Sequence, residues 1–205
     1  MKSDKIDLFI YFSIDLMSLK RLIFMLPDEL IASILVYVSG NDLLKYLKFF
    51  NKSFGSVIQK YGKLFNVELS DITDADLYYL SGVGKIDLSY CDLITDAGLA
   101  HLQGVHTINL LDCWLITDAG LDHLKGVHTV DLSCCYGITD AGLEHLLGVH
   151  TISLSNCMQI TDAGLVWIRG IHTIDLYNCK QITDTGLCAF KRSAYHQFVV
   201  LHGDN

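Results

Sequence analysis

Proline is almost missing from this chain, with one residue in 205. Also missing is any run of about 18 to 20 uncharged apolar residues, the length that a membrane-spanning helix needs. The low proline content excludes collagen-like and proline-rich low-complexity chains, and 51% hydrophobic residues are enough to bury a core. We therefore expect a soluble, folded chain without a membrane segment.

The motifs of common enzyme classes are missing as well. The sequence holds no G-x-x-x-x-G-K-S/T phosphate loop, no G-x-G-x-x-G dinucleotide motif and no G-x-S-x-G nucleophile motif. It therefore predicts no catalytic residue and no cofactor. We expect the protein not to be an enzyme.

Basic residues are scarce in the second part of the chain. Residues 1–66 contain nine Lys and Arg against six Asp and Glu, whereas residues 67–205 contain six against seventeen. The opposite signs suggest two parts with different roles. Because an acidic surface repels phosphate groups, we expect no nucleic-acid binding by residues 67–205.

Five of the seven cysteines recur at intervals of 22 residues, namely Cys91, Cys113, Cys135, Cys157 and Cys179. This spacing is typical of a sequence repeat rather than of a disulfide framework or a C-x-x-C zinc site. Reduced thiols in turn favour a cytoplasmic or nuclear protein. We expect these five side chains to face inward as small buried groups.

The sequence from Ile72 onward repeats with the same period of 22 residues, which is typical of a solenoid. New units begin at Ile94, Ile116, Ile138, Ile160 and Ile182. In the unit that starts at Ile94, Val105-x-x-Ile108-x-Leu110-x-x-Cys113 contains a short stretch in which apolar and polar side chains alternate, as in a strand. The strand should therefore place Ile108 and Leu110 on one side and Asn109 on the other.

The other half of each unit predicts a short helix. Thr95 can cap this helix with its hydroxyl, and Asp96 lies where the helix dipole favours a negative charge. Leu99 and Leu102 are three residues apart and should face inward. Gly104 then frees the chain to turn into the strand.

The segment Cys113-x-x-Ile-Thr-Asp-x-Gly-Leu121 resembles the signature of cysteine-containing leucine-rich repeats, and the likeness covers about residues 70–190. It implies an α/β solenoid, with a short curved parallel sheet and helices on the outside. Stacked units would form a continuous core that a single unit cannot close. Residues 192–201 depart from the repeat and are expected to form a terminal strand that caps the array.

Residues 26–58 resemble an F-box, a small domain of three helices. The matching positions are Leu26, Pro27, Glu29, Leu30, Ile34, Leu35, Asp42, Leu43, Leu44, Asn51, Lys52 and Phe54. Helices are expected from Pro27, within residues 42–47 and within residues 51–58. The predicted organisation is an N-terminal segment (1–25), an F-box (26–66) and leucine-rich repeats with a C-terminal cap (67–205).

Together the two parts resemble the F-box/leucine-rich-repeat substrate receptors of SCF ubiquitin ligases. The resemblance implies that the F-box docks the Skp adaptor subunit, which the cullin scaffold carries, while the repeats hold a protein substrate. The implied adaptor-binding residues are Leu26, Pro27, Leu30, Ile31, Ile34, Leu35, Leu43 and Leu44. Independently, a helical unit of about 40 residues is too small to be stable alone and should share its apolar surface.

Two alternatives to the ligase role stay open. The helices can form a simple N-terminal cap of the solenoid. The chain can also be an acidic leucine-rich-repeat protein that inhibits or scaffolds a basic partner without any role in ubiquitin transfer.

Comparison of the units shows which positions are free to vary, and these cluster at the strand ends and in the loops behind them. An acidic strand face with an aromatic rim is a candidate surface for a basic protein partner, because Trp and Tyr often anchor interfaces. Random drift at exposed positions is the alternative explanation. The predicted substrate-binding residues are Asp87, Asn109, Trp114, Asp131, Tyr136, Asp175 and Tyr177.

Two columns of histidines follow the repeat, one with His106, His128, His150 and His172 and one with His101, His123 and His145. Duplication of the unit explains them, and no unit offers the closed ligand group of a zinc site, so we expect no metal. Protonated rings on neighbouring units would repel one another. We therefore expect the fold to lose stability below about pH 6.

Overall fold

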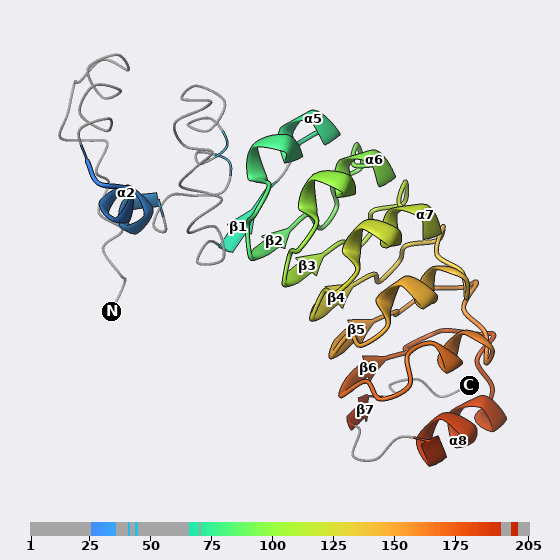
Figure 1. The fold of residues 1–205 in the computed structure, drawn as a ribbon. Helices are drawn as coiled ribbons and strands as arrows, with labels where there is room; N and C mark the ends of the chain where they lie inside the picture. Colours follow the sequence, from blue (N-terminus) through green and yellow to red (C-terminus); the bar gives the residue numbers. More distant parts are fainter. Residues whose placement is uncertain are drawn as a thin grey trace, which may run out of the picture.

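The structure is a computed structural model that describes residues 26–35, 41, 44, 66–69, 71–193 and 198–200. From residue 66 onward the described chain forms an arc of stacked units (Figure 1). Strands line the inner side of the arc and helical turns line its outer side (Figure 1). The predicted solenoid with a curved parallel sheet is therefore confirmed.

In the described residues seven parallel strands form one sheet, and their order in space is their order in the chain. Lys85 lies opposite Thr107, an offset of 22 residues that recurs through the middle of the sheet. Only the outermost pairings depart from it, with Asn66 opposite Lys85 and Thr173 opposite Phe198. The strands are β1 (Asn66–Glu68), β2 (Lys85–Asp87), β3 (Thr107–Asn109), β4 (Thr129–Asp131), β5 (Thr151–Ser153), β6 (Thr173–Asp175) and β7 (Phe198–Val200). The predicted terminal strand is β7.

The outer side consists of short α-helical and 3-10 (η) turns. They are α5 (Asp74–Leu77), η2 (Tyr78–Leu80), α6 (Asp96–Leu99), η3 (Ala100–Leu102), α7 (Asp118–Leu121), η4 (Asp122–Leu124), η5 (Gly142–Leu146), η6 (Gly164–Val166) and the longer α8 (Asp184–Ser193). The predicted cap is present, since the Thr95 hydroxyl accepts a hydrogen bond from the Ala97 amide at 3.2 Å. Gly104 has a φ of 81°, which a glycine adopts without strain where the helical turn passes into the strand.

The core is a set of apolar columns that run along the arc. In the unit that starts at Ile94, the predicted inward residues Leu99, Leu102, Ile108 and Leu110 are all buried. The same positions are buried in the units before and after it, so each side chain packs against its own equivalents. Because a unit contacts mainly its neighbours, the interior is continuous only when the units are stacked.

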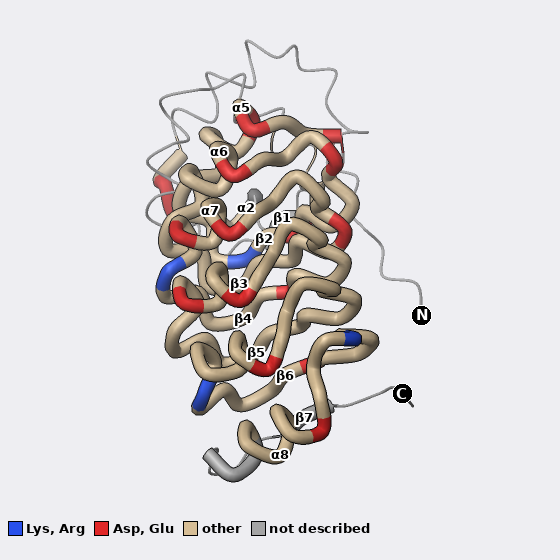
Figure 2. Tube along the Cα trace, turned by 90° about the vertical axis from the view of Figure 1, so that its right-hand side faces the viewer, with Lys and Arg blue, Asp and Glu red and all other residues tan. Residues whose placement is uncertain are grey.

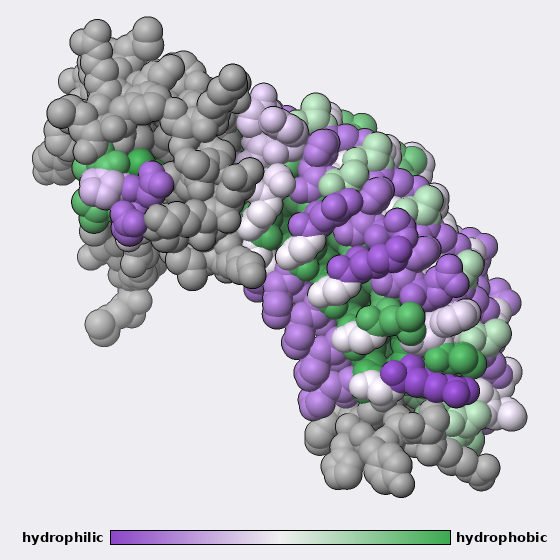
Figure 3. Space-filling model, in the orientation of Figure 1, coloured by the Kyte–Doolittle hydropathy of each residue, from purple (hydrophilic) through white to green (hydrophobic). Residues whose placement is uncertain are grey.

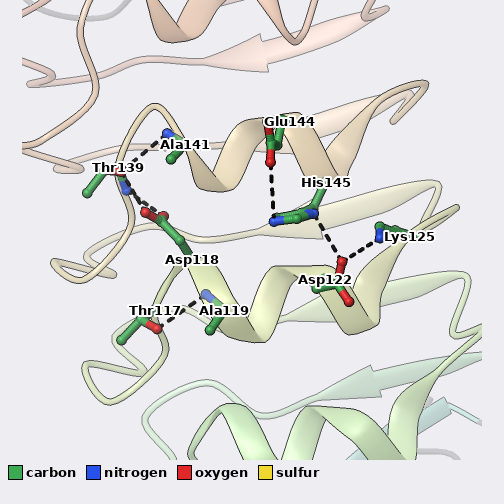
Figure 4. A network of polar contacts seen from close by, with 9 residues as sticks. All are labelled: Thr117, Asp118, Ala119, Asp122, Lys125, Thr139, Ala141, Glu144 and His145. Atoms are coloured by element: carbon green, nitrogen blue, oxygen red, sulfur yellow. Dashed lines mark hydrogen bonds and ion pairs between the residues drawn. The ribbon is translucent and has the colours of Figure 1, made fainter.

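A clamp between aspartate and threonine joins consecutive units on the outer side (Figure 4). The Asp118 carboxylate accepts hydrogen bonds from the Thr139 amide at 2.8 Å and from the Thr139 hydroxyl at 2.6 Å. The same two bonds recur at every junction from Asp74–Thr95 to Asp162–Thr183. The aspartates therefore hold the next unit, in addition to lying at the helix start.

This clamp explains the glycine that follows it in the repeat. A Cβ atom added at Gly120 would lie 2.3 Å from Asp96 Oδ1, closer than two such atoms can approach. The first unit has Asp76 at the glycine position, and its carboxylate accepts the Thr73 amide at 2.9 Å. The departure from the repeat at Asp76 thus supplies a local cap where the row of clamps begins.

The described part of the predicted F-box is mainly α2 (Asp28–Leu35). The Pro27 carbonyl accepts hydrogen bonds from the amides of Leu30 and Ile31, so the helix starts at the proline as predicted. Asp28 is in the first turn, where the helix dipole favours a negative charge. Apart from Leu44, the other two predicted helices lie outside the described residues.

Candidate protein-binding surface

Each strand leads into a tight loop that closes on a buried cysteine. The Cys113 thiol donates a hydrogen bond to the Leu88 carbonyl at 3.1 Å, and Cys135 binds the Leu110 carbonyl in the same way. Burial raises the pKa of Cys113 to about 12. These thiols therefore stay protonated at neutral pH and act as structural donors rather than nucleophiles.

The backbone of these loops is fixed by the next unit. Tyr90 and Asp112 have φ angles of 62° and 61°, in the left-handed region. Their amides each donate a 2.8 Å hydrogen bond to a carbonyl of the following unit, those of Leu111 and Ser133. The backbone that carries the loop side chains is therefore held in place by hydrogen bonds to the following unit.

The predicted acidic residues at the strand ends have a structural role that the repeat pattern did not reveal. The Asp87 carboxylate accepts the Ser89 amide at 2.9 Å and thereby closes the turn after β2. The same bond is made by three other predicted residues, Asn109, Asp131 and Asp175. All four side chains are half-buried.

The loops after β2, β3 and β4 carry large exposed apolar side chains. Exposed fractions are 66% for Tyr90, 59% for Leu93, 54% for Trp114 and 51% for Tyr136. Tyr177, which was predicted to belong to the same surface, is also exposed but follows β6, two strands further along. We call the cluster on the first three of these loops the strand-end rim, which consists of Tyr90, Asp92, Leu93, Asp112, Trp114 and Tyr136.

One carboxylate lies directly beside an aromatic ring of the rim. The Trp114 indole Nε1 donates a hydrogen bond to Asp92 Oδ1 at 3.2 Å, so the indole leans over the preceding unit. The Cys134 thiol, then partial burial and then the Asp112 carboxylate raise the pKa of Tyr136. The structure thus joins the predicted anchor Trp114 to Asp92, which was not predicted as a site residue.

Along the beginning of the strands a second feature follows the sheet. His106, His128, His150 and His172 stack face to face, with ring centroids 4.6, 4.5 and 4.4 Å apart. Each Nδ1 lies within hydrogen-bond distance of the hydroxyl of the next residue, as for His128 and Thr129 at 3.1 Å. In Figure 3 a row of hydrophilic residues follows the strand side of the arc.

Acidic groups recur along the whole arc, whereas basic groups are few (Figure 2). On the outer side Asp122 pairs with Lys125 and contacts His145 Nδ1 at 3.2 Å (Figure 4). The hydrogen bond from Lys125 is the main cause that lowers the pKa of Asp122. This outer cluster is locally compensated, unlike the carboxylates of the strand-end rim.

The predicted adaptor-binding residues fall into three groups. Leu30 and Pro27 are exposed, and Leu26 is partly buried against the core. Ile31 and Leu44 are buried within the chain. The side chains of Ile34 and Leu35, together with all of Leu43, lie outside the described residues. Among the members whose side chains the structure describes, Leu30 is therefore the large apolar side chain that is exposed to solvent.

The described residues contain neither a metal-binding cluster nor a membrane-spanning helix. No group of three or more His, Cys, Asp or Glu side chains in this part of the chain is arranged to hold a metal ion. None of its helices is both long enough and apolar enough to cross a membrane.

Comparison with known proteins supports the architecture. A family model described as a leucine-rich repeat matches residues 85–102, which run from β2 to the end of η3. A comparison with curated protein sequences gives no match. Among solved structures, a chain of the crystal structure of the Rad7 and Elc1 complex in yeast is similar, with a TM-score of 0.54 and 14% sequence identity.

The class of the fold follows from these matches and from the geometry above. The repeats form a leucine-rich-repeat solenoid, as the sequence predicted. The alignment with the yeast structure covers 76% of this chain and 46% of the other, so this chain corresponds to less than half of that one.

Proposed function

We propose that the chain is a non-enzymatic substrate receptor of an SCF-type ubiquitin ligase. In this proposal the F-box-like segment docks a Skp-type adaptor, which a cullin carries, and the repeats hold a protein substrate. The cytoplasm or the nucleus is the compartment where such a receptor would act.

The observation that carries the proposal is the order of the two parts along the chain. An F-box-like segment with the exposed Leu30 on α2 precedes a leucine-rich-repeat solenoid with an exposed aromatic rim. We propose that the first part supplies the surface for an adaptor and the second the surface for a substrate. The similar yeast structure is also a complex of two proteins, in keeping with a partner-binding role.

The test is direct binding to a purified Skp adaptor. The full chain should form a stable complex with it in size-exclusion chromatography, and Leu30→Asp should lose that complex. A charge buried without a partner in an apolar interface costs several kcal/mol, so the loss should be nearly complete. Exposed Leu30 is a suitable position because its replacement does not disturb the buried core.

Leu147→Asp is the matched control, since Leu147 is another exposed leucine, 62% exposed against 51% for Leu30, on the outer side of the repeats. This variant should bind the adaptor like the original chain. If neither the original chain nor the control binds the adaptor, the ligase role is wrong. The acidic scaffold or inhibitor without a ubiquitin role then becomes the better description.

A further inference from the structure

The strand-end rim is the part of the described surface where negative charge lies beside exposed aromatic rings without a compensating cation. The loops 88–94, 110–116 and 132–138 contain Asp92 and Asp112 but no Lys or Arg. Among the described residues, neither aspartate has an ion-pair partner, and Asp112 has no side-chain hydrogen bond. The two carboxylates are therefore available to a ligand.

The same loops further along the arc provide an internal comparison. At the position of Asp112, the later units carry Asn156 and Asn178, and Asn178 donates a hydrogen bond to Asn156 Oδ1 at 2.7 Å. Asn156 in turn contacts the Cys134 sulfur at 3.5 Å. In the later units, side chains at this position thus form hydrogen bonds between neighbouring loops, whereas the Asp112 side chain forms none within the described part of the chain.

Tyr90 adds evidence from the backbone. Its φ of 62° lies in the left-handed region, which is unfavourable for a bulky side chain and favourable for asparagine. Asn156 and Asn178 occupy the same position in later units with similar φ angles. A strained and exposed tyrosine that leaves two thirds of its surface in solvent is better explained by binding than by the stability of the loop.

We infer that the strand-end rim binds the Arg and Lys side chains of a basic segment in a protein partner. The planar guanidinium of Arg can lie on the face of Trp114 or Tyr136 while it donates hydrogen bonds to Asp92 or Asp112. Cation–π contact and charge pairing then act on the same group. This inference deepens the proposed function and rests on it for the partner's role as substrate.

Rigid loops make the rim suitable for such recognition. The Trp114 indole is held by Asp92, and the Asp112 amide is tied to the Ser133 carbonyl. A side chain that is already ordered loses little conformational freedom on binding. The chemistry that fits is an Arg-containing or Lys-containing segment, because an acidic segment would meet two uncompensated carboxylates.

The test uses the full chain with Trp167→Phe, which leaves Trp114 as the only tryptophan. The probe is a twelve-residue peptide of alternating Arg and Gly, titrated while the Trp114 emission is recorded. Asp92→Asn with Asp112→Asn should weaken binding about tenfold, since two charge contacts are lost. Replacing Trp114 with Leu in the native background, followed by calorimetry, should also weaken it because the π face is lost.

Two controls separate this contact from general attraction to an acidic protein. The first is Asp122→Asn with Glu144→Gln, which removes two exposed negative charges from the outer side. It should bind the Arg peptide like the parent chain. The second is the same peptide with citrulline in place of Arg, which keeps the shape without the charge and should not bind.

The inference is overturned by unchanged Trp114 emission, by equal binding of the citrulline peptide, or by equal weakening in both double variants. Self-association of the chain through the rim, seen as a dimer that Trp114→Leu abolishes, would also overturn it. Adaptor binding is measured separately. If the chain binds the Arg peptide but not the adaptor, the ligase role is wrong and the inference about the rim stands. If the chain binds the adaptor but not the peptide, only the inference about the rim is wrong.

Discussion

At the scale of single residues, the structure is organised by pairs that belong to different units. Thr117 donates two hydrogen bonds to Asp96, and Gly120 leaves room for that same carboxylate. In the Thr-Asp-x-Gly pattern, Thr and Gly therefore face the aspartate of the preceding unit, while Asp binds the threonine of the next unit. A helix propensity scale, by contrast, would count each of these glycines as a loss.

A double-mutant cycle tests this pairing. Gly120→Ala should destabilise the chain by about 1–3 kcal/mol because the new Cβ meets Asp96, although alanine is the better helix former. Asp96→Ala should cost a similar amount, about 1–3 kcal/mol, because the Thr117 donors lose their acceptor. Urea unfolding should show that the combined change costs less than the two separate costs together.

The control for this cycle is Gly120→Ala combined with Asp74→Ala. Asp74 clamps Thr95, one junction away, and does not contact Gly120. Distant changes usually add within about 0.5 kcal/mol. Additive costs in both pairs would contradict the close contact between Gly120 and Asp96.

Many of these residue contacts could be predicted from the sequence, but only those within one unit. Capping by Thr95, burial of Leu99 and the inward Cys113 followed from local spacing. The bond from Asp96 to the next unit did not, because no rule for a single helix indicates a partner 21 residues away. At the strand-end rim, variation between units indicated Trp114, whereas its bond to Asp92 required the geometry.

At the scale of elements, stacking in parallel register turns a repeated side chain into a continuous column. The ring centroids of His106 and His128, which are 22 residues apart, lie 4.6 Å from one another because the neighbouring strands pair residues that are 22 apart. The periodicity predicted the column but not the face-to-face contact. The consequence is that His150, which lies between His128 and His172, is surrounded by rings of its own kind.

The stability of the column should depend on pH. Burial, followed by the neighbouring His172 and His128, lowers the pKa of His150 below its usual 6.5. The folded chain therefore binds fewer protons than the unfolded chain as pH falls past 6.5, so stability is lost between that pH and the lowered pKa. Melting temperature should fall from pH 7.5 to pH 5.5, and it should fall less in His150→Gln.

His123→Gln serves as the comparison, since His123 lies on the outer side and contacts Gln103 rather than another histidine. Its melting curve should follow that of the original chain at each pH. Equal pH dependence in the original chain and in His150→Gln would contradict a role for the stacked column.

At the scale of the whole molecule, the repeats are stacked units joined by nearly equivalent contacts, and the two ends of the stack differ from its middle. The repeat length of 22 residues is kept from β2 to β6, while the outer strands β1 and β7 pair with other offsets. Contacts are made mainly between neighbouring units, so stability should depend on how many junctions are intact. The described structure therefore predicts that a whole unit can be removed but half a unit cannot.

Deletion of residues 117–138 removes one complete unit. Thr139 would then follow Ile116 as Thr117 did, its amide and hydroxyl would meet Asp96, and Gly142 would lie where Gly120 did. We expect a folded chain with a cooperative but lower melting transition in circular dichroism, because one interface is lost. Deletion of residues 117–127 would instead place the strand that begins at Thr129 where a helix cap belongs, and that chain should not melt cooperatively. Equal cooperativity of the two deletions would show that the register between units does not control the fold.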